Sequence, residues 1–117
     1  MESITPLMNL LQGYLKVVSN RQELVASNIA NADTPGYHTK DINFQAAMQQ
    51  ALDEGSQVQL EPAAAEVEGL PERPDGNNVN IDRESLLLGE TQLQYRMGVQ
   101  LIKAEFHRLM TAIKEGN

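Results

Sequence analysis

Two long segments, one at each end of the chain, carry apolar residues at alternating steps of three and four. The N-terminal series is Ile4, Met8, Leu11, Leu15, Val18, Gln22, Val25 and Ile29. The C-terminal series is Leu88, Gln92, Tyr95, Val99, Ile102, Phe106, Leu109 and Ile113. Steps of this kind place a series on one side of an α-helix and are typical of coiled coils. The pattern predicts two long helices, over about 5–31 and 82–115.

Start and stop residues agree with these helices. Thr5 can cap the first helix, and Pro6 suits its first turn because proline has no N–H to leave unpaired. Either Asn80 or Asp82 can cap the last helix, and Gly116 can end it. Three glycines interrupt the helices, and each either allows a neighbouring helix to approach or is tolerated at the surface: Gly13, Gly89 and Gly98.

The middle of the chain differs in charge and periodicity. Residues 33–80 hold nine acids against two bases, so the whole net charge of −7 lies there. Phe44, Met48 and Leu52 recur at four-residue steps and predict a short helix over 43–54, capped by Asn43 and ended by Gly55. Residues 55–78 have no periodicity and contain three prolines, which predicts an irregular loop with a short extended piece near 58–60.

These features predict an all-α protein whose long N- and C-terminal helices pack as an antiparallel coiled coil. Residues 1–32 and 81–117 form the helical domain, and 33–80 form a connecting segment with a turn, a short helix and a flexible acidic loop. Val25 and Ile29 are expected to face Val99–Phe106. The expected helix-packing residues are Leu11, Leu15, Val18, Val25, Ile29, Tyr95, Val99, Ile102, Phe106, Leu109 and Ile113.

The stretch SNIANADTPGY, residues 27–37, ends the first helix with many hydrogen-bonding groups. Thr34-Pro35-Gly36-Tyr37 predicts a type II turn with positive φ at Gly36. Gly36→Val is therefore expected to disrupt assembly more than Gly55→Val. Three side chains can bond the open groups of the helix end: Asn28, Asn31 and Asp33. The motif is either an ordinary capped turn or a rigid structure held against another chain.

Signs of enzyme chemistry or nucleic-acid binding are weak. The chain has no cysteine, and His38 and His107 are far apart, outside any metal-ligand spacing. No phosphate-binding or dinucleotide-binding motif occurs, and no basic patch suits nucleic acid. We therefore expect no catalytic residue, cofactor, metal or small-molecule substrate. The N-terminus also lacks the pattern of a cleaved secretion signal, and no apolar run is long enough to span a membrane.

Several motifs resemble the bacterial flagellar axial proteins, the family of rod, hook and hook-associated subunits. SNIANADTPGY is similar to the N-terminal signature of this family, and the pieces that follow it are most similar to proximal rod subunits. These pieces are Asp41-Ile42-Asn43-Phe44, Asp75-Gly76-Asn77-Asn78-Val79, Asp82-Arg83-Glu84 and the ending FHRLMTAIKEG. The resemblance covers about 1–52 and 75–117, whereas 55–74 matches no familiar pattern.

The resemblance implies a structural subunit that is exported by the flagellar type III apparatus and polymerises in the periplasmic rod. Its partners would be copies of itself, other rod subunits and proteins beside the MS ring and export gate. Each helix also carries a second apolar stripe: Leu7, Leu10, Tyr14, Val17 and Leu24 in the first, and Leu86, Leu93, Met97 and Ala104 in the last. These stripes independently favour polymerisation, because a single hairpin would leave them uncovered. We expect the subunit to be ordered mainly within the assembly. The alternatives are a soluble helical adaptor or export chaperone and, less favoured, a small enzyme that uses the TPGY loop.

Overall fold

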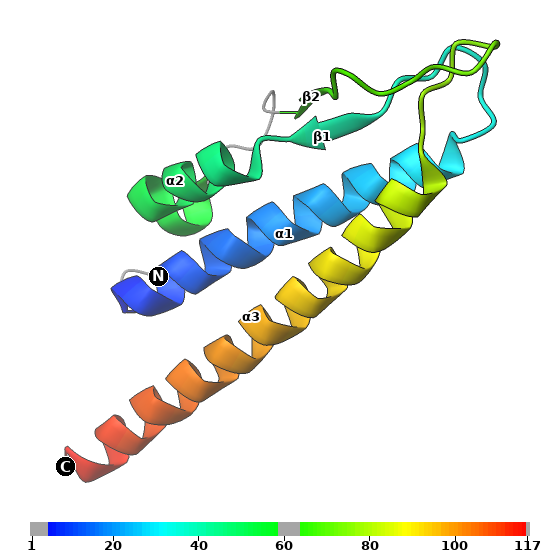
Figure 1. Cartoon of the computed structure of the whole chain (residues 1–117). Helices are drawn as coiled ribbons and strands as arrows, with labels where there is room; N and C mark the ends of the chain where they lie inside the picture. Colours follow the sequence, from blue (N-terminus) through cyan, green and yellow to red (C-terminus); the bar gives the residue numbers. More distant parts are fainter. Residues whose placement is uncertain (1–4, 59–63, 117) are drawn as a thin grey trace.

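The computed structural model describes residues 5–58 and 64–116. Within them the elements follow the order α1 (Pro6–Ala30), β1 (Lys40–Ile42), α2 (Phe44–Glu54), the 3-10 helix η1 (Gly55–Gln57), β2 (Ala64–Glu66) and α3 (Ile81–Glu115). Helix α1 lies in the middle, with α2 on one side and α3 on the other (Figure 1). The described chain is elongated, with extents of 68 × 23 × 17 Å.

The predicted helix boundaries are confirmed to within one residue. The Thr5 hydroxyl accepts a 3.0 Å hydrogen bond from Met8 N, and Pro6 is the first helical residue of α1. Of the two possible caps for α3, the structure uses Asn80, whose side chain accepts a 3.0 Å bond from Arg83 N. The Asn43 side chain caps α2 in the same way by accepting from Ala46 N at 3.0 Å. Each cap satisfies a backbone donor that the first helical turn leaves open.

Helices α1 and α3 lie side by side and run in opposite directions (Figure 1). Asn28 contacts Glu84 at one end of the pair and Thr5 contacts Glu105 at the other, each through a 2.8 Å hydrogen bond. Val25 therefore lies beside the first turns of α3, and the predicted pairing of Val25 with Val99–Phe106 is wrong. The end of α1 pairs with the start of α3 at the loop end, and the pairing continues from there toward the start of α1. The 35-residue α3 extends past the start of the 25-residue α1.

The face of α3 that contacts α1 is rotated from the predicted one. Its buried residues are Glu84, Thr91, Gly98 and Glu105, each seven positions from the next. The prediction that Tyr95, Phe106 and Ile113 pack within the hairpin is wrong, because these side chains are 41%, 59% and 59% exposed. On α1, Leu11, Val18 and Val25 are buried; the other predicted packing residues, Leu15, Ile29, Val99, Ile102 and Leu109, are half-buried.

Gly98 explains much of this rotation. A Cβ atom at this position would lie 2.6 Å from Leu15 Cδ2 and 3.0 Å from Tyr14 Cε2. The absence of a side chain therefore lets α1 approach the backbone of α3 closely. The number of apolar residues predicts that a flank of α3 faces α1. Close packing of the two helices instead favours the face of α3 that carries Gly98, which has no side chain.

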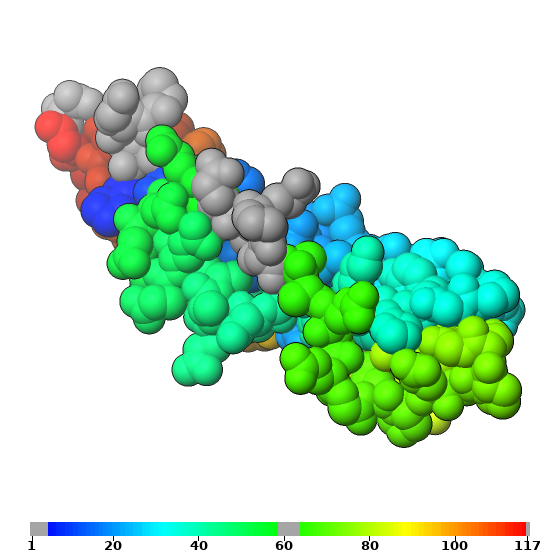
Figure 2. All heavy atoms as spheres, turned by 90° about the horizontal axis from the view of Figure 1, so that it is seen from above, coloured from blue at the N-terminus to red at the C-terminus, as the bar shows by residue number. Residues whose placement is uncertain are grey.

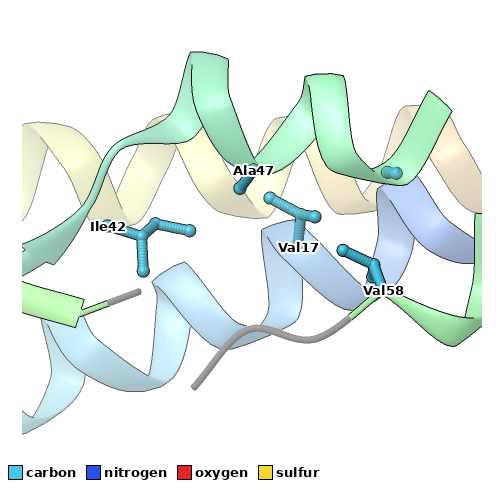
Figure 3. Close-up of a cluster of buried hydrophobic side chains, with 5 residues drawn as sticks. Val17, Ile42, Ala47 and Val58 are labelled. Carbon is cyan, nitrogen blue, oxygen red and sulfur yellow. The ribbon is translucent and has the colours of Figure 1, made fainter. Parts of the chain in front are cut away.

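Helix α2 covers the side of α1 that faces away from α3. Val17, Ile42, Ala47, Ala51 and Val58 form the buried apolar cluster there (Figure 3). In the second apolar stripe of α1, Val17 and Leu24 are thus covered within the chain, whereas Leu7 stays 49% exposed.

The connecting segment contains a small antiparallel sheet that the sequence did not predict. Strand β1 pairs with β2, with Lys40 opposite Glu66 and Ile42 opposite Ala64. Three-residue strands without alternating apolar residues give almost no periodic signal. Of the extended piece expected near 58–60, residues 59 and 60 lie outside the described residues.

Two glycines with positive φ differ in their surroundings. A Cβ atom at Gly55 (φ 61°) would lie 1.9 Å from Asn9 Nδ2, whereas one at Gly36 (φ 76°) would meet nothing within 4 Å. Within the subunit, valine at Gly55 therefore adds a collision to the backbone strain that both positions share. The predicted order of the two substitutions in their effect on assembly stays a prediction. The positive φ predicted for Gly36 is confirmed.

Candidate functional site

The loop end of the hairpin brings together residues 27–41 and 73–84, which we call the clasp. Its two segments meet at one end of the molecule, where the cyan and yellow-green surfaces touch (Figure 2). Five polar residues there are buried: Asn28, Thr39, Asn77, Asn78 and Glu84. Buried polar groups are costly unless they are hydrogen-bonded, so their partners decide what the clasp does.

Asn28 is the centre of the clasp. Its side-chain amide donates 2.8 Å hydrogen bonds to Lys40 O and to Glu84 Oε1. Its side-chain oxygen accepts 3.0 Å bonds from Lys40 N and from the Tyr37 hydroxyl. One side chain thus uses both donors and two acceptor positions to join α1, β1 and the start of α3.

Asn77 and Asn78 hold the connecting segment against the end of α1. The Asn77 amide donates to Asn31 O at 2.9 Å and to Thr34 O at 2.8 Å. The Asn78 side-chain oxygen accepts from Thr39 N at 2.7 Å. The sequence indicated only a turn at 75–78, because nothing in the local pattern shows that these side chains reach residues more than thirty positions away.

The TPGY turn has the hydrogen bond of a β-turn, from Tyr37 N to Thr34 O at 3.2 Å. Gly36 N also donates to Asp75 O at 2.9 Å, and a Cβ atom at Gly76 would lie 3.3 Å from Gly36 Cα. The two glycines therefore let two turns approach each other closely. Asp33, Thr34, Pro35 and Gly36 are exposed, whereas Asn31 and Tyr37 are half-buried.

Asn31 closes the end of α1 locally. Its side-chain amide donates to Ser27 O at 2.8 Å, and its side-chain oxygen accepts from the Thr34 hydroxyl at 3.0 Å. Of the seven predicted motif residues, the structure thus brings Asn28, Asn31, Thr34, Gly36 and Tyr37 into one network. It shows no side-chain hydrogen bond for Asp33, and Pro35 acts through its place in the turn.

Charged side chains extend the clasp along the hairpin. Arg21 makes two 3.0 Å hydrogen bonds to the Asp41 carboxylate and lies 5.5 Å from the centre of the Phe44 ring. Arg83 lies 3.5 Å from Asp41 and pairs with the buried Glu84. The Glu84 carboxylate is therefore buried with a cation and an amide donor beside it, which offsets its loss of hydration.

A second polar contact lies at the far end of the hairpin. Glu105 accepts a 2.8 Å hydrogen bond from the Thr5 hydroxyl and two bonds, at 2.9 and 2.7 Å, from Arg108. The bonds from Arg108 and Thr5 lower the pKa of Glu105 to about 2. This carboxylate stays ionised at neutral pH and fixes the register of the two helices together with Asn28.

His38, which lies just before β1, contacts two glutamates of the acidic segment rather than a set of metal ligands. Its two ring nitrogens lie 3.0 Å from Glu66 and 3.1 Å from Glu72. The hydrogen bond with Glu66, helped by the charges of Glu66 and Glu72, raises the pKa of His38. Among the described residues, no group of three or more potential ligands could hold a metal ion.

Helix α3 carries two exposed apolar flanks, one on each side of its contact with α1. One flank consists of Leu86, Leu93, Met97 and Leu101, which are 52–72% exposed. The other includes Tyr95, Phe106 and Met110, which are 41–59% exposed. A contiguous exposed apolar surface of this kind marks an interaction site. No helix in the described part of the chain has the length and apolar character that a membrane span requires.

The hairpin is held together at its loop end, and its long helix exposes two apolar flanks. These features are typical of a protein that assembles with other subunits. Comparison with known proteins agrees. Residues 8–38, which span most of α1 and the TPGY turn, match the model of the flagella basal body rod protein family.

Curated relatives cover most of the chain. It is 32% identical to the flagellar basal body rod protein FlgB of Escherichia coli, over 91% of each chain. It is 35% identical to the FlgB protein of Agrobacterium fabrum, over 80% of this chain and 81% of that one. The chain belongs to the FlgB family of flagellar basal body rod proteins. It is a structural component of the flagellar basal body, and the adaptor alternative is not favoured.

Proposed function

We propose that this chain polymerises at the base of the flagellar rod, next to the MS ring and the export gate, and that motility requires it. The observation that carries the proposal is the exposed apolar surface of α3, which has no cover within the described chain. In an assembly, neighbouring subunits bury this surface, and its removal from water stabilises the polymer by about 25 cal/mol per Å².

The clasp residues support the same function in a different way. We propose that they hold α3 at a defined angle and register to α1, so that every copy presents its flanks identically. A helical polymer needs this uniformity because each contact repeats along the assembly. The predicted division into a helical domain (1–32 and 81–117) and a connecting segment (33–80) is part of this proposal, with the helical domain forming the axial core.

The proposal is tested in cells from which this chain has been deleted. We expect basal bodies that retain their membrane ring but lack a rod, and cells that do not swim. Expression of the intact chain should restore both properties. An export-deficient strain is the control for location, because the protein should then remain in the cytoplasm. Rod-bearing basal bodies in the deletion strain would contradict the proposal.

A further inference from the structure

An open groove of about 740 Å³ lies along one side of the hairpin, between the start of α1 and the far half of α3. Met8, Ile102, Phe106 and Met110 make its surface largely apolar, and Lys103 supplies a cation. Gln12 and His107 complete the lining, which includes no acid. Such a groove fits an apolar helical stripe with acidic residues beside it.

Two cations on this half of α3 have no ion-pair partner among the described residues. Arg21, Arg83 and Arg108 are all held in ion pairs. Lys103 lines the groove and makes no ion pair with a described residue. Arg96 makes none either; it lies beside Lys103 in an adjoining pocket and also borders the Leu93 flank. The far half of α3 thus offers unpaired positive charge beside exposed apolar side chains.

The opposite end of α3 has the complementary pattern. Leu86 and Leu93 are 72% and 57% exposed, and Asp82 and Glu90 lie on the same side of the helix at four-residue spacing from Leu86. Asp82 makes no ion pair with a described residue, and Glu90 is half exposed while it lies 3.6 Å from Arg21. An acidic, apolar stripe therefore begins α3, and a basic, apolar groove flanks its far half.

We propose that the groove around Phe106 binds the Leu86 stripe of a second copy of this chain. The inference rests on the proposed function and specifies its subunit contact. Apolar side chains meet, and Lys103 of one copy faces Asp82 and Glu90 of the next. The two patches are different surfaces of the same chain, so the contact is head-to-tail, and it builds an open assembly unless a rotation closes it into a ring.

The absence of cysteine from the chain allows a direct test by disulfide cross-linking in flagellated cells. The test variant carries both Leu86→Cys and Phe106→Cys. The two positions are 20 residues apart on one helix, or about 30 Å, so they cannot form a bond within one copy. On mild oxidation we expect a ladder of cross-linked dimers and larger species, whereas each single variant alone should give no dimer.

The matched control combines Ser85→Cys with Phe106→Cys, because Ser85 is exposed next to Leu86 but points away from the stripe. We expect about ten-fold less cross-linked product, because a disulfide needs Cα atoms within about 7 Å. A second pair, Leu93→Cys with Met110→Cys, samples the same contact one step along both stripes and should also give a ladder.

Analysis of isolated basal bodies distinguishes failure of the docking proposal from failure of the proposed rod function. If they contain the test variants but neither test pair cross-links above the control, the docking proposal is wrong and the rod function stands. If a single-cysteine variant dimerises efficiently, the contact pairs identical surfaces and the head-to-tail arrangement is wrong. If basal bodies from cells with the intact chain do not contain it, the proposed function itself fails.

Discussion

At the scale of single residues, side-chain amides of asparagine join distant parts of the chain through hydrogen bonds. Asn28, Asn77 and Asn78 are buried, and each bonds backbone groups of another segment. Asn28 both donates and accepts there, Asn77 donates, and Asn78 accepts. An amide suits this role because it donates and accepts at once without a charge to desolvate. The clasp is therefore sensitive to changes that keep the shape of a side chain but alter its hydrogen-bonding pattern.

Asn28→Asp tests this sensitivity. The substitution removes the two N–H donors and places a carboxylate 2.8 Å from Glu84 Oε1, in a buried site. We expect a loss of about 3–5 kcal/mol in the free energy of unfolding. Urea denaturation followed by circular dichroism measures it.

The control is Asn80→Asp, the same chemical change at the exposed cap of α3. Aspartate caps helices as well as asparagine does, so stability should change by less than about 0.5 kcal/mol. Equal effects of the two substitutions would show that the Asn28 network contributes little.

At the scale of secondary-structure elements, two contacts set the register of the hairpin and one glycine sets its spacing. The Asn28–Glu84 and Thr5–Glu105 hydrogen bonds lie at opposite ends of the α1–α3 pair. Gly98 lies between them, where a Cβ atom would lie 2.6 Å from Leu15 Cδ2, so α1 approaches α3 closely there. Small and polar groups thus help to position the two helices, and the exposed apolar residues on the flanks of α3 are left for other contacts.

Two glycines of α3 should respond oppositely to alanine. In Gly98→Ala the new methyl group would lie 2.6 Å from Leu15 Cδ2, so the helices must separate or repack, at a cost of about 1–3 kcal/mol. In Gly89→Ala the methyl group meets nothing within 4 Å, and the better helix propensity of alanine should stabilise the protein by about 0.5–1 kcal/mol. Thermal or urea denaturation of both variants gives the two signs, and a stabilising Gly98→Ala would refute the close approach.

The Glu105 contact predicts a specific pH dependence. The folded state lowers the pKa of Glu105 to about 2, below its value of about 4.3 in an unfolded chain. Its contribution is therefore fully present above about pH 4.3 and is lost as the pH falls toward 2. The difference in stability between the intact chain and Glu105→Gln should shrink over this range, as measured by denaturation at a series of pH values. Glu23→Gln, at an exposed position of α1, should show no such trend.

At the scale of the whole molecule, the described chain is long and thin, and its buried contacts are unevenly distributed. Its radius of gyration is 17.8 Å, compared with about 13 Å for a compact domain of this length. The apolar cluster and the clasp lie along α1, whereas the last turns of α3 extend past the start of α1. The two ends of the molecule should therefore differ in stability when the subunit is isolated.

Hydrogen exchange should show this difference. In the isolated chain, amides of α3 beyond Glu105 should exchange quickly, because few buried contacts oppose local opening there. Amides of the clasp, such as Thr39 N and Asn78 N, should be protected, because both are buried and hydrogen-bonded within the subunit. In purified basal bodies both regions should be protected. Equal protection of the two regions in the isolated chain would contradict the proposed gain of order on assembly.

The sequence by itself determined the helices and their ends. The features that fix them act through neighbouring residues, so local patterns reveal them. These features are the three-four apolar steps, Thr5 with Pro6, Asn43, and the glycine of the TPGY turn. The antiparallel pairing also follows from the sequence, because a connecting segment joins two long apolar helices. The resemblance of SNIANADTPGY to the axial proteins pointed to the family that the relatives then established.

Only the tertiary structure decided which face of α3 meets α1, the register of the pair, and the partners of Asn77, Asn78 and Glu84. Both flanks of α3 are apolar, so an apolar count could not choose between them. The choice depended on the Leu15 contact at Gly98 and on hydrogen bonds between residues 56 and 100 positions apart. Local sequence patterns cannot predict such contacts, because they stabilise the fold only after the distant groups have been brought together.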